Sequence, residues 1–149
     1  MNRYYRLALV AARIVVSVVF LLNGFGVIDQ KIPARELIER GAPAAIVPFV
    51  MMSGRLLEIV AGFGLALGVF PQWSALALLA FLVPATFVSH SFWVAAGTPA
   101  FQGQLINFCK NLAICGGLLF IAASANQPKL FSKRLPVSSG AAKVSSSAA

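Results

Sequence analysis

Two ionisable residues of opposite charge stand three positions apart in an otherwise apolar segment: Arg55 and Glu58. If the segment is helical, the two side chains share a face, so the guanidinium and the carboxylate can pair. Ionisable groups inside a membrane-spanning helix are costly to insert, and they commonly face the bundle interior or a water-filled cavity. As part of a larger polar cluster, such a pair could favour an anionic or carbonyl-bearing ligand.

Four more polar side chains interrupt apolar segments in the same way. They are Asn23, His90, Lys110 and Asn111. With Arg55 and Glu58 they form a candidate polar cluster of two cations, one anion, two amides and an imidazole, a group that in general titrates near neutral pH. One histidine and one carboxylate supply fewer ligands than a closed metal site needs, so no metal site is predicted.

The same cluster also admits a purely structural interpretation. Glu58 could bridge Arg55 and Lys110 and so tie the second span to the fourth, while the amides and the imidazole complete hydrogen bonds between helices. Polar contacts of this kind stabilise many membrane bundles without doing chemistry. From the sequence, a ligand site and a structural clamp both remain open.

The composition indicates what kind of fold must position these side chains. Of the 149 residues, 59% are hydrophobic and 11% are charged, against about 45–50% and 25% in a typical soluble domain. The run from Ile59 to Cys109 contains no Asp, Glu, Lys or Arg. It is far longer than the roughly 20 residues that cross a bilayer as one helix, so it must fold back.

The sequence therefore predicts an all-α membrane protein, a four-helix transmembrane bundle within residues 1–126. Pro71 and the segment 97–99 mark two of the turns, because Gly and Pro interrupt the apolar pattern there. The helices are expected near residues 7–28, 48–70, 73–96 and 104–125. Residues 127–149 are rich in Ser, Ala and Lys and are predicted to form a disordered, basic cytoplasmic tail, since they cannot bury enough apolar surface to fold.

The distribution of Lys and Arg predicts the orientation of the bundle. Six of them flank its two ends and three lie in the loop after the first helix, whereas the other two loops have none. Because cations in short flanking segments are retained in the cytoplasm, both termini are predicted to be cytoplasmic. The polar cluster then lies in the outer halves of the helices. The net charge of +8 is explained by topology, and no nucleic-acid partner is predicted.

Two further features concern the packing and the long first loop. Small residues that recur along a helix let another helix approach closely, and the predicted packing residues are Gly54, Gly62, Gly64, Gly68, Gly116 and Gly117. In the first loop, residues 33–40 could form a short helical turn, with Pro33 in a first-turn position that tolerates proline. This segment is either a solvated loop on the outer surface or a lid that gates a substrate.

Four motifs in these helices resemble those of the DoxX family of small four-helix membrane proteins. They are Arg55-x-x-Glu58-x-x-x-Gly62, His90-x-Phe92-Trp93, Phe108-x-Lys110-Asn111 and Gly116-Gly117-Leu118-Leu119. The resemblance runs from the first helix through Ala125 and implies the four-helix membrane fold. The family takes its name from a thiosulfate:quinone oxidoreductase subunit, so the resemblance also implies a quinone-like ligand and a membrane or membrane-associated redox protein as partner. For a bacterial chain, the predicted location is the inner membrane.

Three functions follow as hypotheses. The first is an accessory membrane subunit of a redox-linked complex, without catalytic activity alone, whose outer polar cluster serves assembly or binds a quinone-like molecule. The second is a quinone-dependent membrane oxidoreductase subunit, which would need a partner, because no residue of the cluster carries electrons without a cofactor. The third, a small-molecule transporter, requires two alternating openings, and the sequence shows no inverted repeat of broken helices.

Overall fold

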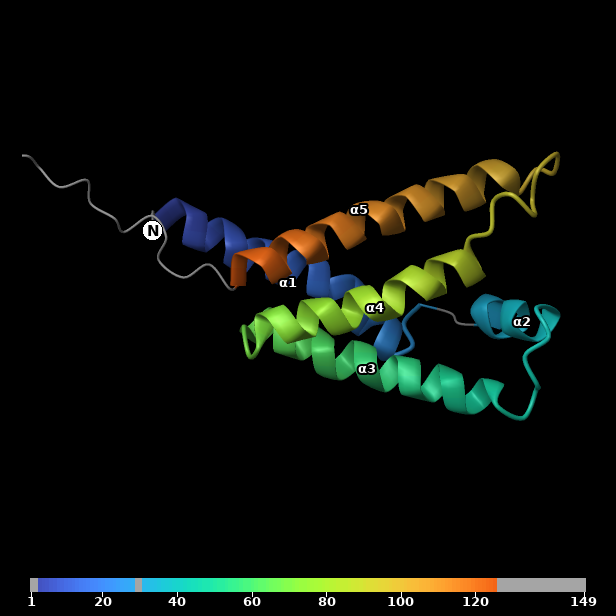
Figure 1. Ribbon diagram of the computed structural model, residues 1–149, viewed down its shortest axis with the longest axis horizontal. Coiled ribbons are helices and arrows are strands. Elements are labelled where there is room, and N and C mark those ends of the chain that lie inside the picture. Colours follow the sequence, from blue (N-terminus) through green and yellow to red (C-terminus); the bar gives the residue numbers. More distant parts are fainter. Residues whose placement is uncertain (1–2, 29–30, 126–149) are drawn as a thin grey trace, which may run out of the picture.

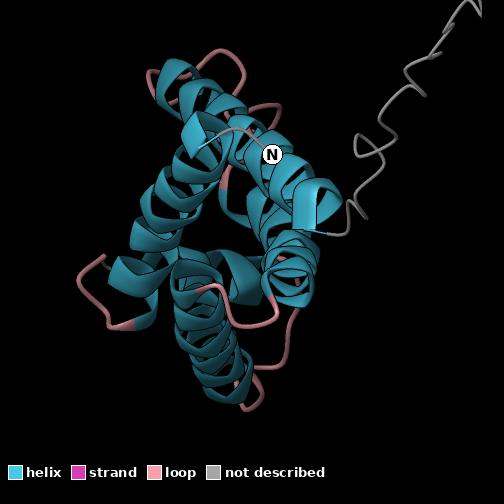
Figure 2. Ribbon diagram, turned by 90° about the vertical axis from the view of Figure 1, so that its left-hand side faces the viewer, coloured by secondary structure: helices cyan, strands magenta, loops and turns pink. Residues whose placement is uncertain are grey.

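The computed structural model describes residues 3–28 and 31–125 (Figure 1). In this part of the chain the helices are α1 (Arg3–Gly24), α2 (Lys31–Glu39), α3 (Val47–Leu67), α4 (Pro71–Ser89) and α5 (Phe101–Ala125). All except α2 are long and apolar enough to cross a membrane. The described residues form helices and loops only (Figure 2). The predicted all-α four-helix transmembrane bundle is confirmed, and the tail predicted for residues 127–149 lies outside the described residues.

The turn between α3 and α4 follows from its residue types. Gly68 adopts a left-handed conformation with φ of 75°, and its N–H bonds to the carbonyl of Leu65, while Val69 bonds to that of Gly64. Glycine is favoured at this position after a helix because it has no Cβ to clash. Pro71 then begins α4, where a missing N–H costs nothing. The tight turn makes α3 and α4 an antiparallel pair.

The helices meet in the chain order α1, α3, α4 and α5 around the bundle. α1 packs against α3, α3 against α4, and α4 against α5, while α1 touches α5 over a smaller area. The core between them includes Leu65, Leu78 and Leu118, each 0% exposed. α2 lies across one end of the bundle, beside α3 and α4 (Figure 1). We refer to this end, which also holds the α4–α5 turn, as the α2 end.

α4 ends earlier than the apolar pattern predicts, at Ser89 instead of residue 96. The residues that follow are turns whose aromatic side chains pack on α5 instead of continuing the helix. The ring of Phe92 lies 5.2 Å from that of Phe108, and the ring of Trp93 lies 6.0 Å from it. Apolar composition alone therefore misplaced this helix end, because aromatic residues of a packed turn look like helix interior in the sequence.

The predicted packing glycines divide into three kinds. Four lie against a neighbouring side chain: Gly54 against Phe81, Gly62 against Leu21, Gly64 against Ser74 and Gly117 against Val16. Gly68 ends α3, and the guanidinium of Arg13 lies over it, with Nη1 2.9 Å from where a Cβ would stand. Gly116 does not pack against the described residues, since nothing lies within 4 Å of its Cβ position. It is turned about 100° from Gly117 and faces outward.

Gly24 is a packing residue that the sequence analysis did not single out. A Cβ there would stand 2.7 Å from Cγ1 of Ile59 and 3.1 Å from the carbonyl oxygen of Arg55. No side chain larger than hydrogen fits without a shift, so Gly24 sets how closely α1 approaches α3. This close approach brings the preceding residue, Asn23, next to the Arg55 and Glu58 segment.

Candidate functional site

The centre of the candidate site is the carboxylate of Glu58 on α3, which is only 2% exposed. Nδ2 of Asn23 on α1 donates to both carboxylate oxygens, at 2.7 and 2.8 Å. Arg55, one turn earlier on α3, interacts electrostatically with the same carboxylate. A buried charge is tolerated only when it is paired and hydrogen-bonded. The contact between Asn23 and Glu58 supplies this stabilisation and joins α1 to α3.

A cavity of about 490 Å³ opens beside this carboxylate at the α2 end, and every described helix contributes to its lining. Its polar lining residues are Asn23, Arg55, Glu58, Ser89, His90 and Asn111. The remaining lining is apolar, including Phe20, Met51 and Phe81. Apolar walls with a few convergent polar groups are typical of small-molecule sites, and the volume lies within their usual range of about 300–1,000 Å³.

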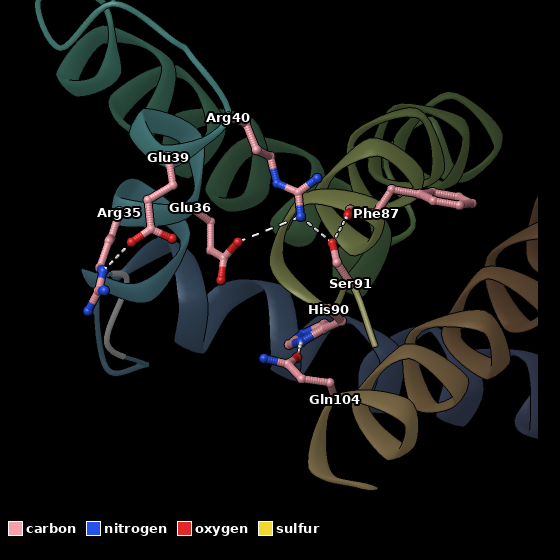
Figure 3. A network of polar contacts seen from close by, with 8 residues as sticks. All are labelled: Arg35, Glu36, Glu39, Arg40, Phe87, His90, Ser91 and Gln104. Atoms are coloured by element: carbon pink, nitrogen blue, oxygen red, sulfur yellow. Dashed lines mark hydrogen bonds and ion pairs between the residues drawn. The ribbon is translucent and has the colours of Figure 1, made fainter. Parts of the chain in front are cut away.

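The α4 and α5 side of the cavity is held by two polar contacts. Oγ1 of Thr86 donates to the carbonyl of Leu82 at 2.7 Å and accepts from Nδ2 of Asn111 at 3.0 Å. At the end of α4, Nδ1 of His90 lies 3.0 Å from Oε1 of Gln104 on α5 (Figure 3). Each contact joins α4 to α5 and fixes the orientation of a side chain that lines the cavity.

Lys110 does not belong to this site. Its side chain is exposed, it does not line the cavity, and no described residue forms an ion pair or hydrogen bond with it. Lys110 directly precedes Asn111, and successive residues of a helix are rotated by about 100° around its axis. The side chain of Lys110 therefore points away from the direction in which Asn111 faces the cavity. The structure therefore gathers the other five residues of the predicted polar cluster and leaves Lys110 on the outside. Among the described residues, Glu58 is not a bridge between Arg55 and Lys110.

α2 covers the cavity and is tied to the end of α4. Pro33 and Leu37 lie one helical turn apart on α2, and both line the cavity. Arg40, directly after α2, donates to Oγ of Ser91 and lies 3.6 Å from the carboxylate of Glu36 (Figure 3). Oγ of Ser91 donates in turn to the carbonyl of Phe87 at 2.6 Å. The segment predicted as a short turn is thus a helix that contacts the site.

The opposite face of α2 carries an exposed ion pair. Nε of Arg35 donates to Oε1 of Glu39 at 2.6 Å (Figure 3). The hydrogen bond and the charge of Glu39 raise the pKa of Arg35, which keeps the guanidinium protonated. Ion pairs at such spacing on an exposed helix face add little stability. α2 therefore presents an apolar side to the cavity and a charged side away from it.

Two contacts around the site were not predicted from the sequence. Gln104 was taken only as the start of the last span, and Arg40 only as a loop cation four residues after Glu36. Both side chains form hydrogen bonds with residues far away in the sequence: Gln104 with His90, and Arg40 with Ser91. Their residue types gave no signal, because an amide or a cation near the end of a membrane helix is ordinary.

The arrangement can bind a small molecule and exchange protons with it through Glu58 or His90. It offers no metal site in the described residues, where no three His, Cys, Asp or Glu side chains come together. The two cysteines, Cys109 and Cys115, are free.

The comparisons with known proteins agree with this fold. The family model for DoxX matches residues 8–91, which is more than half of the chain. Inner membrane protein YphA of Escherichia coli (strain K12) is 29% identical over 119 residues, which cover 76% of this chain and 80% of the relative. No solved structure matches the chain significantly.

Proposed function

The chain belongs to the DoxX family and is a multi-pass protein of the inner membrane, and from this we propose that it is an accessory subunit of a redox-linked membrane complex. In this role the cavity at the α2 end binds a quinone-like molecule. The cavity faces the outer side of the membrane in the predicted orientation, with both termini cytoplasmic. The partner is a membrane or membrane-associated redox protein that supplies or accepts the electrons.

The observation that carries this proposal is the combination of cavity shape and chemistry. A volume of about 490 Å³ accommodates a ring-sized head group, and the apolar walls suit a lipid-soluble molecule. Arg55 can donate to a ligand oxygen, while Glu58 and His90 can exchange protons with it. All three side chains line the same cavity.

A structural clamp is the competing explanation, and one feature of the geometry favours the ligand site. The contact between Asn23 and Glu58 is itself a clamp, since it joins α1 to α3. His90 and Asn111 are held by other partners on the α4 and α5 side. These polar contacts could join the helices without a cavity. A bound molecule, in contrast, requires the cavity that the same residues line.

The proposal is tested by identifying small molecules that remain bound when the protein is extracted in native lipid nanodiscs. Mass spectrometry is applied to wild type, to Glu58→Gln and to Lys110→Gln, the last being a control outside the cavity. We expect a quinone that is retained by wild type and Lys110→Gln and lost from Glu58→Gln. Bulk lipid alone in all three preparations would contradict the proposal and would make the cluster a structural clamp.

A further inference from the structure

The hydrogen bond between His90 and Gln104 determines what the imidazole can offer to a ligand. Nδ1 of His90 faces Oε1 of Gln104 at 3.0 Å. A carbonyl oxygen only accepts, so Nδ1 must carry the proton in this contact. In a neutral imidazole the other nitrogen then has no proton, and the contact leaves Nε2 as an acceptor. His90 lines the cavity, whereas Gln104, the partner of Nδ1, does not, so Nε2 is the ring nitrogen that remains for a ligand.

Among the other polar groups of the cavity, Ser89, Asn111 and Arg55 can bond to either ligand form, whereas the carboxylate of Glu58 favours a hydroxyl. Asn111 gives one N–H to Thr86 and keeps a second N–H and an oxygen, so it can donate or accept. Arg55 donates to a ligand oxygen whether that oxygen is a carbonyl or a hydroxyl. Glu58 accepts from Asn23 through both oxygens, and the remaining lone pairs of its carboxylate can accept from a ligand hydroxyl. His90 is therefore one of two acceptors in the cavity, and it is the one whose acceptor character depends on a second residue, Gln104.

We infer that the cavity binds the hydroxyl form of its ligand, a quinol or another phenolic amphiphile, in preference to the carbonyl form. The inference rests on the proposed function and names the ligand state that the site selects. A ligand hydroxyl can donate a hydrogen bond to Nε2 of His90. A quinone oxygen has no proton to donate, so its lone pair would face the lone pair of Nε2 and the two would repel each other. Sites that hydrogen-bond a hydroxyl discriminate strongly against analogues that lack it, because a buried polar group is left unpaired.

In this arrangement Gln104 is a positioning residue. It does not line the cavity, and it acts by holding the proton on Nδ1 of His90. Replacing it with an apolar residue frees the imidazole to place its proton on either nitrogen. Replacing it with lysine supplies a donor to Nδ1, which moves the proton to Nε2 and turns His90 into a donor.

The test measures dissociation constants for the full chain in nanodiscs at one fixed pH of about 8. One pair of probes is a decyl-substituted benzoquinone and its hydroquinone under anaerobic conditions. A second pair, 4-decylphenol and its methyl ether, differs only in the hydroxyl proton and has no redox chemistry. The variants are Gln104→Leu and Gln104→Lys, with Gln102→Leu as a matched control at an exposed glutamine nearby.

We expect wild type and Gln102→Leu to bind each hydroxyl probe at least about tenfold more tightly than its partner. The ratio should fall in Gln104→Leu and fall further in Gln104→Lys, where His90 becomes a donor and only Glu58 still accepts from the hydroxyl. Equal or tighter binding of the quinone by wild type overturns the inference and leaves the proposed function standing. A ratio unchanged by both Gln104 variants also overturns it. Binding of neither probe of either pair overturns the inference together with the proposed function.

Discussion

At the scale of single residues, the buried carboxylate of Glu58 depends on partners from two helices. Asn23 donates to both oxygens from α1, and Arg55 interacts with the carboxylate from the same face of α3. Removing one member of a buried ionic group costs more than the group contributes as a whole, because the remaining charge is left uncompensated. The stability of single and double variants therefore distinguishes a paired group from an isolated one.

Glu58→Ala should lower the free energy of unfolding by at least about 2 kcal/mol, because it removes the acceptor of two hydrogen bonds from Asn23 and the negative charge that faces Arg55. Adding Arg55→Met should restore part of this loss, since the double variant removes both charges. The measurement is thermal unfolding in one detergent. Lys110→Met is the control and should stay within about 0.5 kcal/mol of wild type, as a change outside the cavity does. A double variant less stable than Glu58→Ala would contradict the pairing.

The residue types of the site could be found from the sequence, but not their mutual arrangement. Ionisable and amide side chains in apolar spans are rare enough to be noticed, and this identified Glu58, Asn23 and His90. The angular position of each residue on its helix decides which of them meet, and this depends on helix rotation within the bundle. Lys110 shows the limit, because its type suggested a partner for Glu58 while its position on α5 turns it outward.

At the scale of elements, the contact between α1 and α3 depends on Gly24 of α1 as well as on Gly62 of α3. The Cβ position of Gly24 is blocked by Ile59 and by backbone of α3, whereas that of Gly116 on α5 is open. The two glycines therefore respond oppositely to a methyl group. Spacing in the sequence could not separate them, because spacing does not show which helix, if any, lies opposite.

Gly24→Ala should lower the free energy of unfolding by about 1–3 kcal/mol, because the added methyl group overpacks a full contact. Gly116→Ala should leave it unchanged or raise it by up to about 1 kcal/mol, since alanine is the better helix former and nothing obstructs it. Thermal unfolding of both variants in the same detergent provides the comparison. If the two substitutions had the same sign, the assignment of the close contact to Gly24 would fail.

The position of α2 over the cavity depends on the contact between Arg40 and Ser91. Arg40→Ala should speed hydrogen exchange of the α2 amides about tenfold, which corresponds to one lost charge-assisted hydrogen bond. Exchange in α3 to α5 should not change, because Arg40 lies outside the bundle core. Arg35→Ala is the matched control, since the pair with Glu39 is exposed and makes no contact with α4. Equal acceleration by both variants would show that Arg40 does not tether α2.

At the scale of the whole molecule, the orientation in the membrane decides which compartment the cavity faces. The four long helices and their antiparallel order could be predicted from hydropathy, because backbone groups in a bilayer are satisfied within each helix. The orientation depends on loop charges alone, which are not a property of the packed bundle. The bundle geometry fixes only that α2 and the cavity lie at one end, opposite the turn between α3 and α4.

Loop charges predict that the α2 end faces away from the cytoplasm, and this can be tested with single cysteines in a variant that lacks Cys109 and Cys115. A cysteine at Glu39 on α2 should react with a membrane-impermeant maleimide in intact cells, whereas one at Val69 in the α3–α4 turn should react only after the membrane is opened. The reason is that the three cations near α2 are outnumbered by the six that flank the ends of the bundle. The reverse labelling pattern would place the cavity on the cytoplasmic side, and the redox partner would then have to dock from the cytoplasm.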